Sequence, residues 1–212
     1  MWIVGTGGFA REVNDYVRKS GDLLDGHLDD HPPEPSGRFQ RIFRIGDPRA
    51  RGHYVIAIGS NSDRMQVADQ IALLYGAELK PCVYIATNVH IGGGCIIETG
   101  SILCPGVVVS ADCTIGKHCI LNIMSSVTHG DVIGDFVNIA PGAMVLGNCT
   151  VGEGVYIGAN ATLREGVKIG AWATIGAGAV VTRDVPAGEK WVGVPAGLMA
   201  QAGPGAQGTS GP

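Results

Sequence analysis

Two places in this chain carry residue types whose spacing could support chemistry. The first is Gly5-Thr6-Gly7-Gly8-Phe9-Ala10, which follows a short apolar stretch and precedes Val13 and Val17, one helical turn apart. In the pattern G-x-G-x-x-G/A between a strand and a helix, glycines let backbone N–H groups and the helix N-terminus approach a pyrophosphate. On its own the pattern is equally consistent with a tight turn between a strand and a helix.

The second place is His129, whose imidazole could act as a general base by accepting a proton from a reacting group. It follows Val127 by two residues, and the repeat described below predicts that Val127 points inward, so His129 should project outward. The residue one coil later in that repeat is Gly147, which leaves open space and a free backbone N–H above the ring. A solvated surface histidine is the alternative interpretation.

The elements that would hold the glycine loop lie within residues 1–80. Asp29 and Asp30 come at the end of a predicted second strand, where an acidic residue meets a ribose in nucleotide-binding folds. A third predicted strand, 54–58, ends in Gly59 and precedes a helical stretch. Alternating strands and helices predict a small parallel sheet with a ligand crevice at the strand ends. A domain of this half size suits a mononucleotide or a nucleotide sugar.

A six-residue repeat predicts the fold of residues 81–200. Every sixth residue from Ile85 to Val181 is Ile, Leu or Val, and the residue two positions earlier is nearly always small. This period fits a parallel β-helix of very short strands, in which the aliphatic side chains point inward and residues 18 apart stack. Four small positions hold cysteines that we expect to be inert packing residues: Cys95, Cys113, Cys119 and Cys149. Residues 201–212, rich in Gly, Pro, Ser and Gln, are expected to be a disordered tail.

The composition excludes several function classes. The 212 residues carry a net charge of -4 with 16% charged side chains, which argues against a nucleic-acid binder because that would need a basic face. No apolar run reaches membrane-spanning length, and Met1 begins a strand-like stretch rather than a signal peptide. A cytoplasmic location without a membrane span is therefore expected. The six cysteines include no C-x-x-C pair, so neither a zinc site nor a redox motif is indicated.

Taken together, the motifs resemble the hexapeptide-repeat sugar acetyltransferases, a family of bacterial nucleotide-4-amino-sugar N-acetyltransferases and sialic-acid O-acetyltransferase-like enzymes. The similarity covers about residues 2–200 and rests on the stretches 5–13, Leu28-Asp29-Asp30, Ala57-Ile58-Gly59, Leu121-Asn122, Val127-Thr128-His129, 132–136 and 139–143. It implies an α/β N-terminal half-Rossmann-like domain followed by a left-handed parallel β-helix of hexapeptide repeats. It also implies a homotrimer with active sites between the prisms, acetyl-CoA as co-substrate and no metal.

The resemblance further implies a role for individual residues. His129 is implied as the general base for acetyl transfer from acetyl-CoA to the 4-amino group of a UDP- or GDP-linked sugar. Contacts with the nucleotide sugar are implied for Gly7, Gly8, Phe9, Asp29, Asp30, Gly59 and Asn122, and contacts with acetyl-CoA for Asn138, Gly147, Ala159 and Ala177. A sugar O-acetyltransferase and a non-catalytic nucleotide-sugar binder are the alternatives. The sequence leaves open which nucleotide, which sugar and what acyl length are used.

Three positions depart from the family pattern: Phe9 replaces a usual histidine, Gly130 the acidic residue after the base, and Asn138 a histidine that contacts acetyl-CoA. Asp112 lies 18 residues before Gly130, and strands of adjacent coils are about 4.8 Å apart, so we hypothesise that Asp112 orients His129. Alternatively, the amine needs only a weak base. Asp131 occupies a small corner position and is expected to point inward. The missing acidic partner favours an amine acceptor, because a hydroxyl needs more activation than a neutral amine.

A zinc site is not expected from the histidines. Zinc-dependent hexapeptide β-helices hold their metal with three histidines, two of them five residues apart. His90, His118 and His129 are separated by 28 and 11 residues, so that pair is missing. His90 and His118 are therefore expected to be turn or surface residues, and His27 of the first domain is also expected at the surface.

Overall fold

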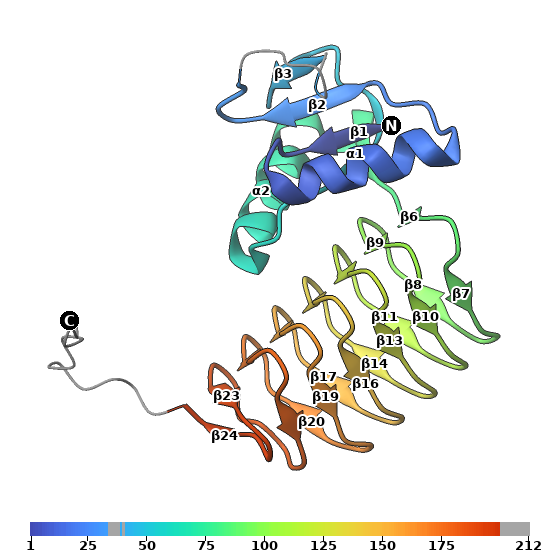
Figure 1. Cartoon of the computed structure of the whole chain (residues 1–212). Helices are drawn as coiled ribbons and strands as arrows, with labels where there is room; N and C mark the ends of the chain where they lie inside the picture. Colours follow the sequence, from blue (N-terminus) through green and yellow to red (C-terminus); the bar gives the residue numbers. More distant parts are fainter. Residues whose placement is uncertain (34–38, 40, 200–212) are drawn as a thin grey trace, which may run out of the picture.

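The computed structural model describes residues 1–33, 39 and 41–199, and it places an α/β domain at one end of a prism-shaped β-helix (Figure 1). The sheet of the first domain ends at Pro81, and the first strand of the prism begins at Tyr84. The predicted tail at 201–212 lies outside the described residues. Within the described part of the chain, no helix is long and apolar enough to cross a bilayer.

The N-terminal domain is a five-stranded parallel sheet with the strand order β3-β2-β1-β4-β5. Its strands are β1 (Trp2–Val4), β2 (Gly26–Asp29), β3 (Ile42–Arg44), β4 (Gly52–Ile56) and β5 (Leu79–Pro81). Its helices are α1 (Gly8–Ser20), α2 (Asn61–Tyr75) and the short η1 (Gly76–Glu78). The sequence pattern correctly predicts the parallel sheet, three of the strands and both α-helices. It does not reveal β3 and β5, because edge strands of three residues carry almost no periodic signal.

Alternation along β1 explains why the sheet is covered on both faces. Ile3 packs into the apolar cluster that includes Val13 of α1, whereas Val4 packs into the cluster that includes Ile71 of α2. The chain runs from β1 through α1 to β2 on one side, while β4 lies on the other side of β1. The strand order therefore reverses between β1 and β4, and the helices that follow these two strands cover opposite faces of the sheet. Ligands of open parallel sheets bind at such a reversal.

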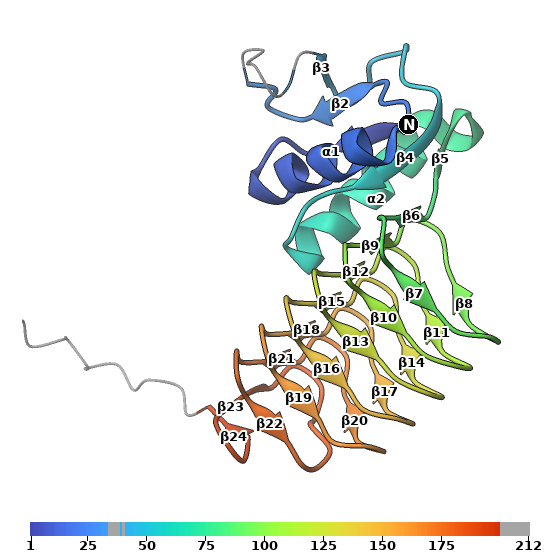
Figure 2. The ribbon, with the colours of Figure 1, turned by 45° about the vertical axis from the view of Figure 1, so that its right-hand side comes forward.

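The rest of the described chain forms a left-handed parallel β-helix, as predicted, with strands stacked into three sheets that we call faces 1, 2 and 3 (Figure 2). Face 1 contains β6 (Tyr84–Ile85), β9 (Ile102–Leu103), β12 (Ile120–Leu121), β15 (Asn138–Ile139), β18 (Tyr156–Ile157), β21 (Thr174–Ile175), β23 (Lys190–Val192) and β24 (Gly197–Leu198). Face 2 contains β7 (His90–Ile91), β10 (Val108–Val109), β13 (Ser126–Val127), β16 (Met144–Val145), β19 (Thr162–Leu163) and β22 (Val180–Val181). Face 3 contains β8 (Ile96–Ile97), β11 (Thr114–Ile115), β14 (Val132–Ile133), β17 (Thr150–Val151) and β20 (Lys168–Ile169).

Each coil from β6 to β22 takes 18 residues, since Val109 pairs with Val127 and Val127 with Val145. The last coil is two residues shorter, since Thr174 pairs with Lys190. The second residue of each strand points into the prism, and Val127, Ile133 and Ile139 are at most 1% exposed. Burying each such side chain contributes about 1.5–3 kcal/mol. The turns between strands lie along three edges. The first edge joins face 1 to face 2, the second edge joins face 2 to face 3, and the third edge joins face 3 to face 1.

Glycines and bulky turn residues alternate between adjacent coils. Trp172 has φ 60°, a left-handed conformation that few non-glycine residues adopt, and its ring lies over Gly154 of the preceding coil. A Cβ at Gly154 would lie 2.6 Å from Trp172 Cε2, so only glycine fits there. Met124 lies over Gly106 in the same way. Side chains at these left-handed positions therefore reach back toward the preceding coil.

Arg64 of α2 joins the two domains. Its side chain is fully buried and donates from Nε to His118 O, from Nη2 to Phe136 O and from Nη1 to Ile58 O, each at 2.8 Å. Residues 118 and 136 lie in turns of the third edge, so the guanidinium ties α2 and the loop after β4 to that edge. Burial lowers the pKa of Arg64 to about 10, which still leaves it charged near pH 7.

His118 lies in a turn, as one of the two expected alternatives, but it is buried, and His27, expected at the surface, is buried as well. His118 does occupy a turn, with φ 53°, but it is only 7% exposed and its ring stacks on Phe136 at 5.3 Å. Burial lowers the pKa of His118 to about 4, so it is neutral near pH 7. His27 is 2% exposed, with Nε2 3.2 Å from Asn14 Oδ1. His90 is exposed, as expected.

Replacing Arg64 by Met should destabilise the chain by about 3–5 kcal/mol, because buried carbonyl oxygens at the domain junction would lose their donor. Urea and thermal unfolding measure this loss. Arg51→Met is the matched control, since Arg51 is an exposed arginine with a surface ion pair to Glu78 at 3.5 Å, and its variant should unfold like the wild type. Equal stability of Arg64→Met and the wild type would contradict the importance of this junction.

Candidate functional site

A small cavity of about 80 Å³ opens at the carboxyl ends of β1, β2 and β4. Its lining comes from the loops after all three strands and includes Gly5, Asp29, Asp30 and Ile58. Gly5 has φ 107°, and a Cβ there would lie 3.2 Å from Ala57 O, so a glycine lets the first and third loops approach closely. The convergence of three loops that the sequence predicts is therefore present.

The start of α1 follows Gly5 directly and is open. Gly7 is the N-cap and supplies no side-chain hydrogen bond, and the first helical turn holds no acidic residue. Neither Gly7 nor Gly8 has a positive φ, and a Cβ on either would meet no atom within 4 Å. Packing therefore does not explain these two glycines. The N–H groups at the helix N-terminus could bind an anion, and the contact of Gly7 and Gly8 with a nucleotide sugar stays a prediction. Phe9 is half-buried and packs against the apolar core.

The two carboxylates predicted to contact a ribose already have partners in the protein. Asp29 accepts from Thr6 Oγ1 at 2.6 Å and from the N–H of His31 at 2.9 Å. Asp30 accepts from Gln70 Nε2 at 3.1 Å. These bonds hold the crevice loops and α2 together, and each carboxylate keeps acceptor capacity for a ligand hydroxyl. Their contact with a ribose stays a prediction.

Gly59 follows β4 and lies where the two domains meet. Its carbonyl oxygen accepts from Asn138 Nδ2 of β15 at 3.0 Å, and Asn138 is only 6% exposed. Asn138 therefore joins the prism to the N-terminal domain, and its position gives no support to the predicted contact with acetyl-CoA. Gly59 also lines an open groove of about 300 Å³ together with Tyr156 and Trp172, which the sequence pattern did not indicate.

His129 lies on the second edge, two residues after the inward Val127 of β13, and is exposed. Its imidazole lies over Gly147, the equivalent residue of the next coil, where a Cβ would be 2.9 Å from Cδ2. The carbonyl oxygen of His129 accepts from the N–H of Asn148 at 2.9 Å, which ties the two turns together. The stacking expected from the repeat is present, and only glycine leaves room for the ring. The role of His129 as a base stays a prediction.

The structure does not bring Asp112 to His129. Asp112 adopts a left-handed turn with φ 57°, and its carboxylate lies over Gly94, one coil before it. The ring of His129, one coil after Asp112, points forward to Gly147. The two side chains therefore point in opposite directions along the prism, so the hypothesis that Asp112 orients His129 has no support within one chain. A separation of 18 residues predicts which residues stack. It does not predict that the side chain of a residue in a left-handed turn points toward the preceding coil.

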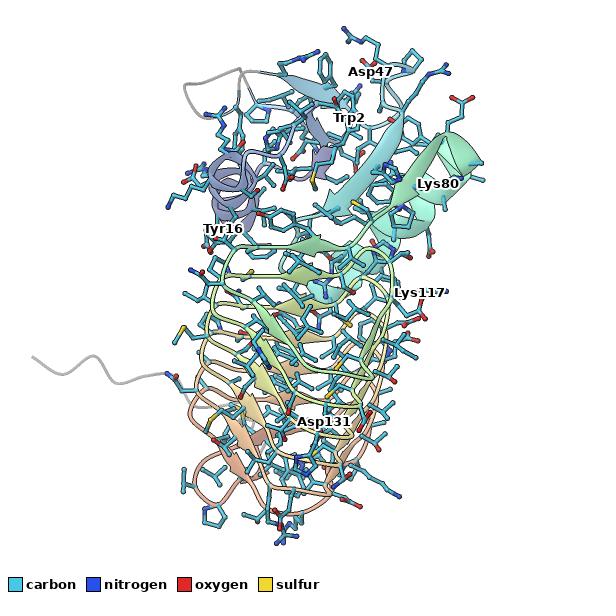
Figure 3. All side chains as sticks on the ribbon, turned by 90° about the vertical axis from the view of Figure 1, so that its right-hand side faces the viewer. Trp2, Tyr16, Asp47, Lys80, Lys117 and Asp131 are labelled. Carbon is cyan, nitrogen blue, oxygen red and sulfur yellow. The ribbon has the colours of Figure 1, made fainter. Side chains whose placement is uncertain are left out.

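Asp131 points into the prism, as its corner position predicts, and is fully buried (Figure 3). Its carboxylate accepts from the N–H of Thr128 and from the N–H of Cys149, both at 2.8 Å. Burial raises the pKa of Asp131 from 3.8 to about 6, while the two hydrogen bonds and the charge of His129 act in the opposite direction. The prism therefore holds an ionised carboxylate near pH 7, in the same turn as the candidate base.

Within one chain, the candidate residues fall on three different edges of the prism. The crevice domain is tied to the third edge by Arg64, and His129 and Gly147 lie on the second. Asn122, Ala159 and Ala177 follow strands of face 1 and so lie on the first edge. Among the described residues, no three His, Cys, Asp or Glu side chains are grouped to hold a metal ion.

The pKa of Asp131 predicts a measurable dependence of stability on pH. A pKa raised on folding means that the folded chain binds this proton more tightly than the unfolded chain. The contribution is therefore full below about pH 4 and is lost as the pH rises through about 6, a change of about 3 kcal/mol. As the pH rises across this range, the free energy of unfolding of the wild type should fall by about 3 kcal/mol more than that of Asp131→Asn. Urea unfolding at several pH values measures this, with Ser101→Ala, another buried corner variant, keeping the wild-type dependence. An unchanged dependence in Asp131→Asn would contradict the raised pKa.

Comparison with known proteins agrees with this architecture. Residues 1–71 match the PglD N-terminal domain, and residues 132–165 and 148–183 match the bacterial transferase hexapeptide family of six repeats. Over 96 residues the chain is 37% identical to GDP-perosamine N-acetyltransferase of Escherichia coli O157:H7, a match that spans 45% of this chain and 42% of that protein.

Two solved structures are similar over nearly the whole fold. WeeI from Acinetobacter baumannii AYE has a TM-score of 0.84 and 31% identity, covering 93% of this chain and 98% of that one. The acetyltransferase domain of PglB from Neisseria gonorrhoeae FA1090, in complex with acetyl coenzyme A, has a TM-score of 0.85 and 28% identity, with the same coverage. The chain therefore belongs to the hexapeptide-repeat sugar acetyltransferase family whose members carry a PglD-type N-terminal domain.

Proposed function

We propose that this protein transfers an acetyl group from acetyl-CoA to the 4-amino group of a nucleotide-linked amino sugar. The observation that carries the proposal is the pairing, in one chain, of a parallel-sheet crevice beside an uncapped α1 N-terminus with an exposed His129 stacked on Gly147. The crevice and the α1 N-terminus suit a nucleoside diphosphate. The histidine stacked on Gly147 suits proton transfer beside an acyl group. The binding of acetyl coenzyme A by the PglB domain, and the name of the curated relative, support both substrates.

The reaction requires one proton acceptor and one hydrogen-bond donor. The amine nitrogen attacks the thioester carbonyl carbon, His129 removes a proton from that nitrogen, and the C–S bond breaks to release the CoA thiolate, which takes up a proton. We assign the developing oxyanion to the N–H of Gly147, which lies beside the imidazole. A neutral amine is a good nucleophile without strong activation, which fits a base followed by Gly130 rather than by an acidic residue.

The site is completed between the chains of a homotrimer in this proposal. One chain places its crevice at the third edge and His129 on the second, so a single chain does not assemble both halves. Large apolar side chains are exposed on face 2 and on the first edge, among them Val108, Met144 and Met124. Exposed apolar surface of this kind marks protein–protein interfaces, and a cyclic arrangement would bring edges of neighbouring prisms together.

Thiol release from acetyl-CoA, measured against UDP- and GDP-linked 4-amino sugars, tests the reaction directly. The wild type should turn over one of them, and His129→Ala should lower kcat by about 100-fold to 10,000-fold through loss of the base. His53→Ala is the control, because His53 is an exposed histidine near the start of β4, at the opposite end of that strand from the crevice. Turnover only with a hydroxyl acceptor would contradict the proposal and indicate an O-acetyltransferase. Binding of a nucleotide sugar without any turnover would indicate a non-catalytic binder.

Gly7→Asp tests the crevice and the shared site together. Aspartate is a good N-cap and has room at this position, but its charge would repel a diphosphate at the α1 N-terminus. We expect KM for the nucleotide sugar to rise by about tenfold or more, while Gly7→Ser, also a good N-cap, has a smaller effect.

Coexpression of Gly7→Asp with His129→Ala then reports on assembly. If each site takes its crevice and its histidine from different chains, a site is intact only when the crevice comes from a His129→Ala chain and the histidine from a Gly7→Asp chain. With equal amounts of the two chains, random trimers should then carry about one quarter of the wild-type number of intact sites. Activity no greater than the sum of the separate variants would contradict a shared site.

A further inference from the structure

Asp131 is the one charged residue in a long series of corner positions. Every sixth residue from Val83 to Ala179 occupies this corner, and all the others are Val, Ala, Ser or Cys. Burying a carboxylate costs free energy unless it is well bound. The charge also falls in the turn that carries His129 and in no other turn. Neither core packing nor the six-residue repeat explains why a carboxylate occupies this corner.

The two oxygens of Asp131 connect the two turns that form the candidate centre. One accepts from the N–H of Thr128, the residue before His129, and so closes the turn around the imidazole. The other accepts from the N–H of Cys149, two residues after Gly147 in the next coil. Together with the bond from Asn148 to His129 O, these contacts fix the ring over the glycine.

We propose that Asp131 is a positioning residue for His129, holding it over Gly147 and supplying from inside the prism the negative charge that Gly130 does not provide. The inference rests on the proposed function. When His129 takes a proton from the amine it becomes a cation, and a fixed anion in the same turn stabilises that cation. The carboxylate contacts neither substrate, since it is fully buried.

The titratable groups that face Asp131 from the adjacent coils are two cysteine thiols. The thiol of Cys113 faces it from the preceding coil and that of Cys149 from the following coil, and burial raises the pKa of each to about 11. Both thiols are therefore neutral over the working range. His129 is two residues from Asp131 in the same turn, and its charge lowers the pKa of the carboxylate, against the larger effect of burial.

Asp131→Ser removes the charge and the bond from Thr128 but keeps an acceptor for the bond from Cys149. Serine is the residue that this fold uses at another corner, where Ser101 Oγ accepts from the N–H of Cys119 at 3.0 Å. The variant thus keeps an acceptor for the next coil and removes the negative charge. We expect kcat to fall by about 100-fold, as for a misplaced catalytic group. KM for both substrates should stay within roughly twofold, because binding is not touched.

The pH dependence of kcat distinguishes a positioning role from a purely structural one, because a loss of stability alone would not change the slope of log kcat against pH. Activity of the wild type requires an ionised Asp131 and a neutral His129, so two enzyme groups must lose protons on the acid limb. In Asp131→Ser and Asp131→Asn, the plot of log kcat against pH should lose one unit of slope on that limb. Ser101→Ala, which removes a comparable corner bond away from His129, should keep the wild-type kcat and slope.

Each outcome separates the inference from the proposed function. Wild-type turnover that persists unchanged in Asp131→Ser, with the same slope, would overturn the inference alone. A loss of kcat with an unchanged slope would assign Asp131 to folding and would also overturn it. If the wild type acetylates none of the amino sugars, the proposed function fails, and the inference fails with it. Circular dichroism and thermal unfolding confirm that each variant is folded before its rate is compared.

Discussion

The coil of 18 residues that repeats from β6 to β22 is the constraint from which the rest of this molecule follows. Because each turn residue meets the residue one coil away, the chemistry of a position is decided jointly by two residues that are distant in sequence. His129 has room only because its neighbour is Gly147, and Trp172 keeps its left-handed turn over Gly154 for the same reason. A parallel ladder with this register permits no local adjustment, since a shift by one residue would exchange inward and outward side chains.

A second constraint acts where the two domains meet. Arg64 brings a full charge into the junction without a carboxylate partner among the described residues, and carbonyl oxygens from both domains bind it instead. Such a junction fixes the crevice relative to the third edge, because every bond depends on the guanidinium fork having one position. A rigid crevice at one edge and a base at another make association of chains part of the proposed chemistry rather than an addition to it.

Stability and chemistry compete at Asp131. Burying a small neutral residue at that corner would not require a charge to be desolvated. All the other corners in the series hold such neutral residues. The carboxylate lies in the turn that carries His129, and its hydrogen bonds to two main-chain N–H groups offset part of the cost of burying its charge. The same buried group is therefore predicted to lower stability as the pH rises and is proposed to position His129.

The sequence by itself determines most of the architecture. The six-residue period specifies the β-helix and the stacking of His129 on Gly147, since both depend only on residue spacing. It also indicates the glycine loop at α1 and the inward direction of Asp131. The tertiary structure alone decides that Asp112 reaches away from His129, that His118 and Asn138 are buried, and that Arg64 links the domains. The reason is physical: a periodic pattern reports which way a side chain leaves its own strand or turn. Burial at a domain interface, and the direction of a side chain along the prism axis, depend on neighbours that no local spacing encodes.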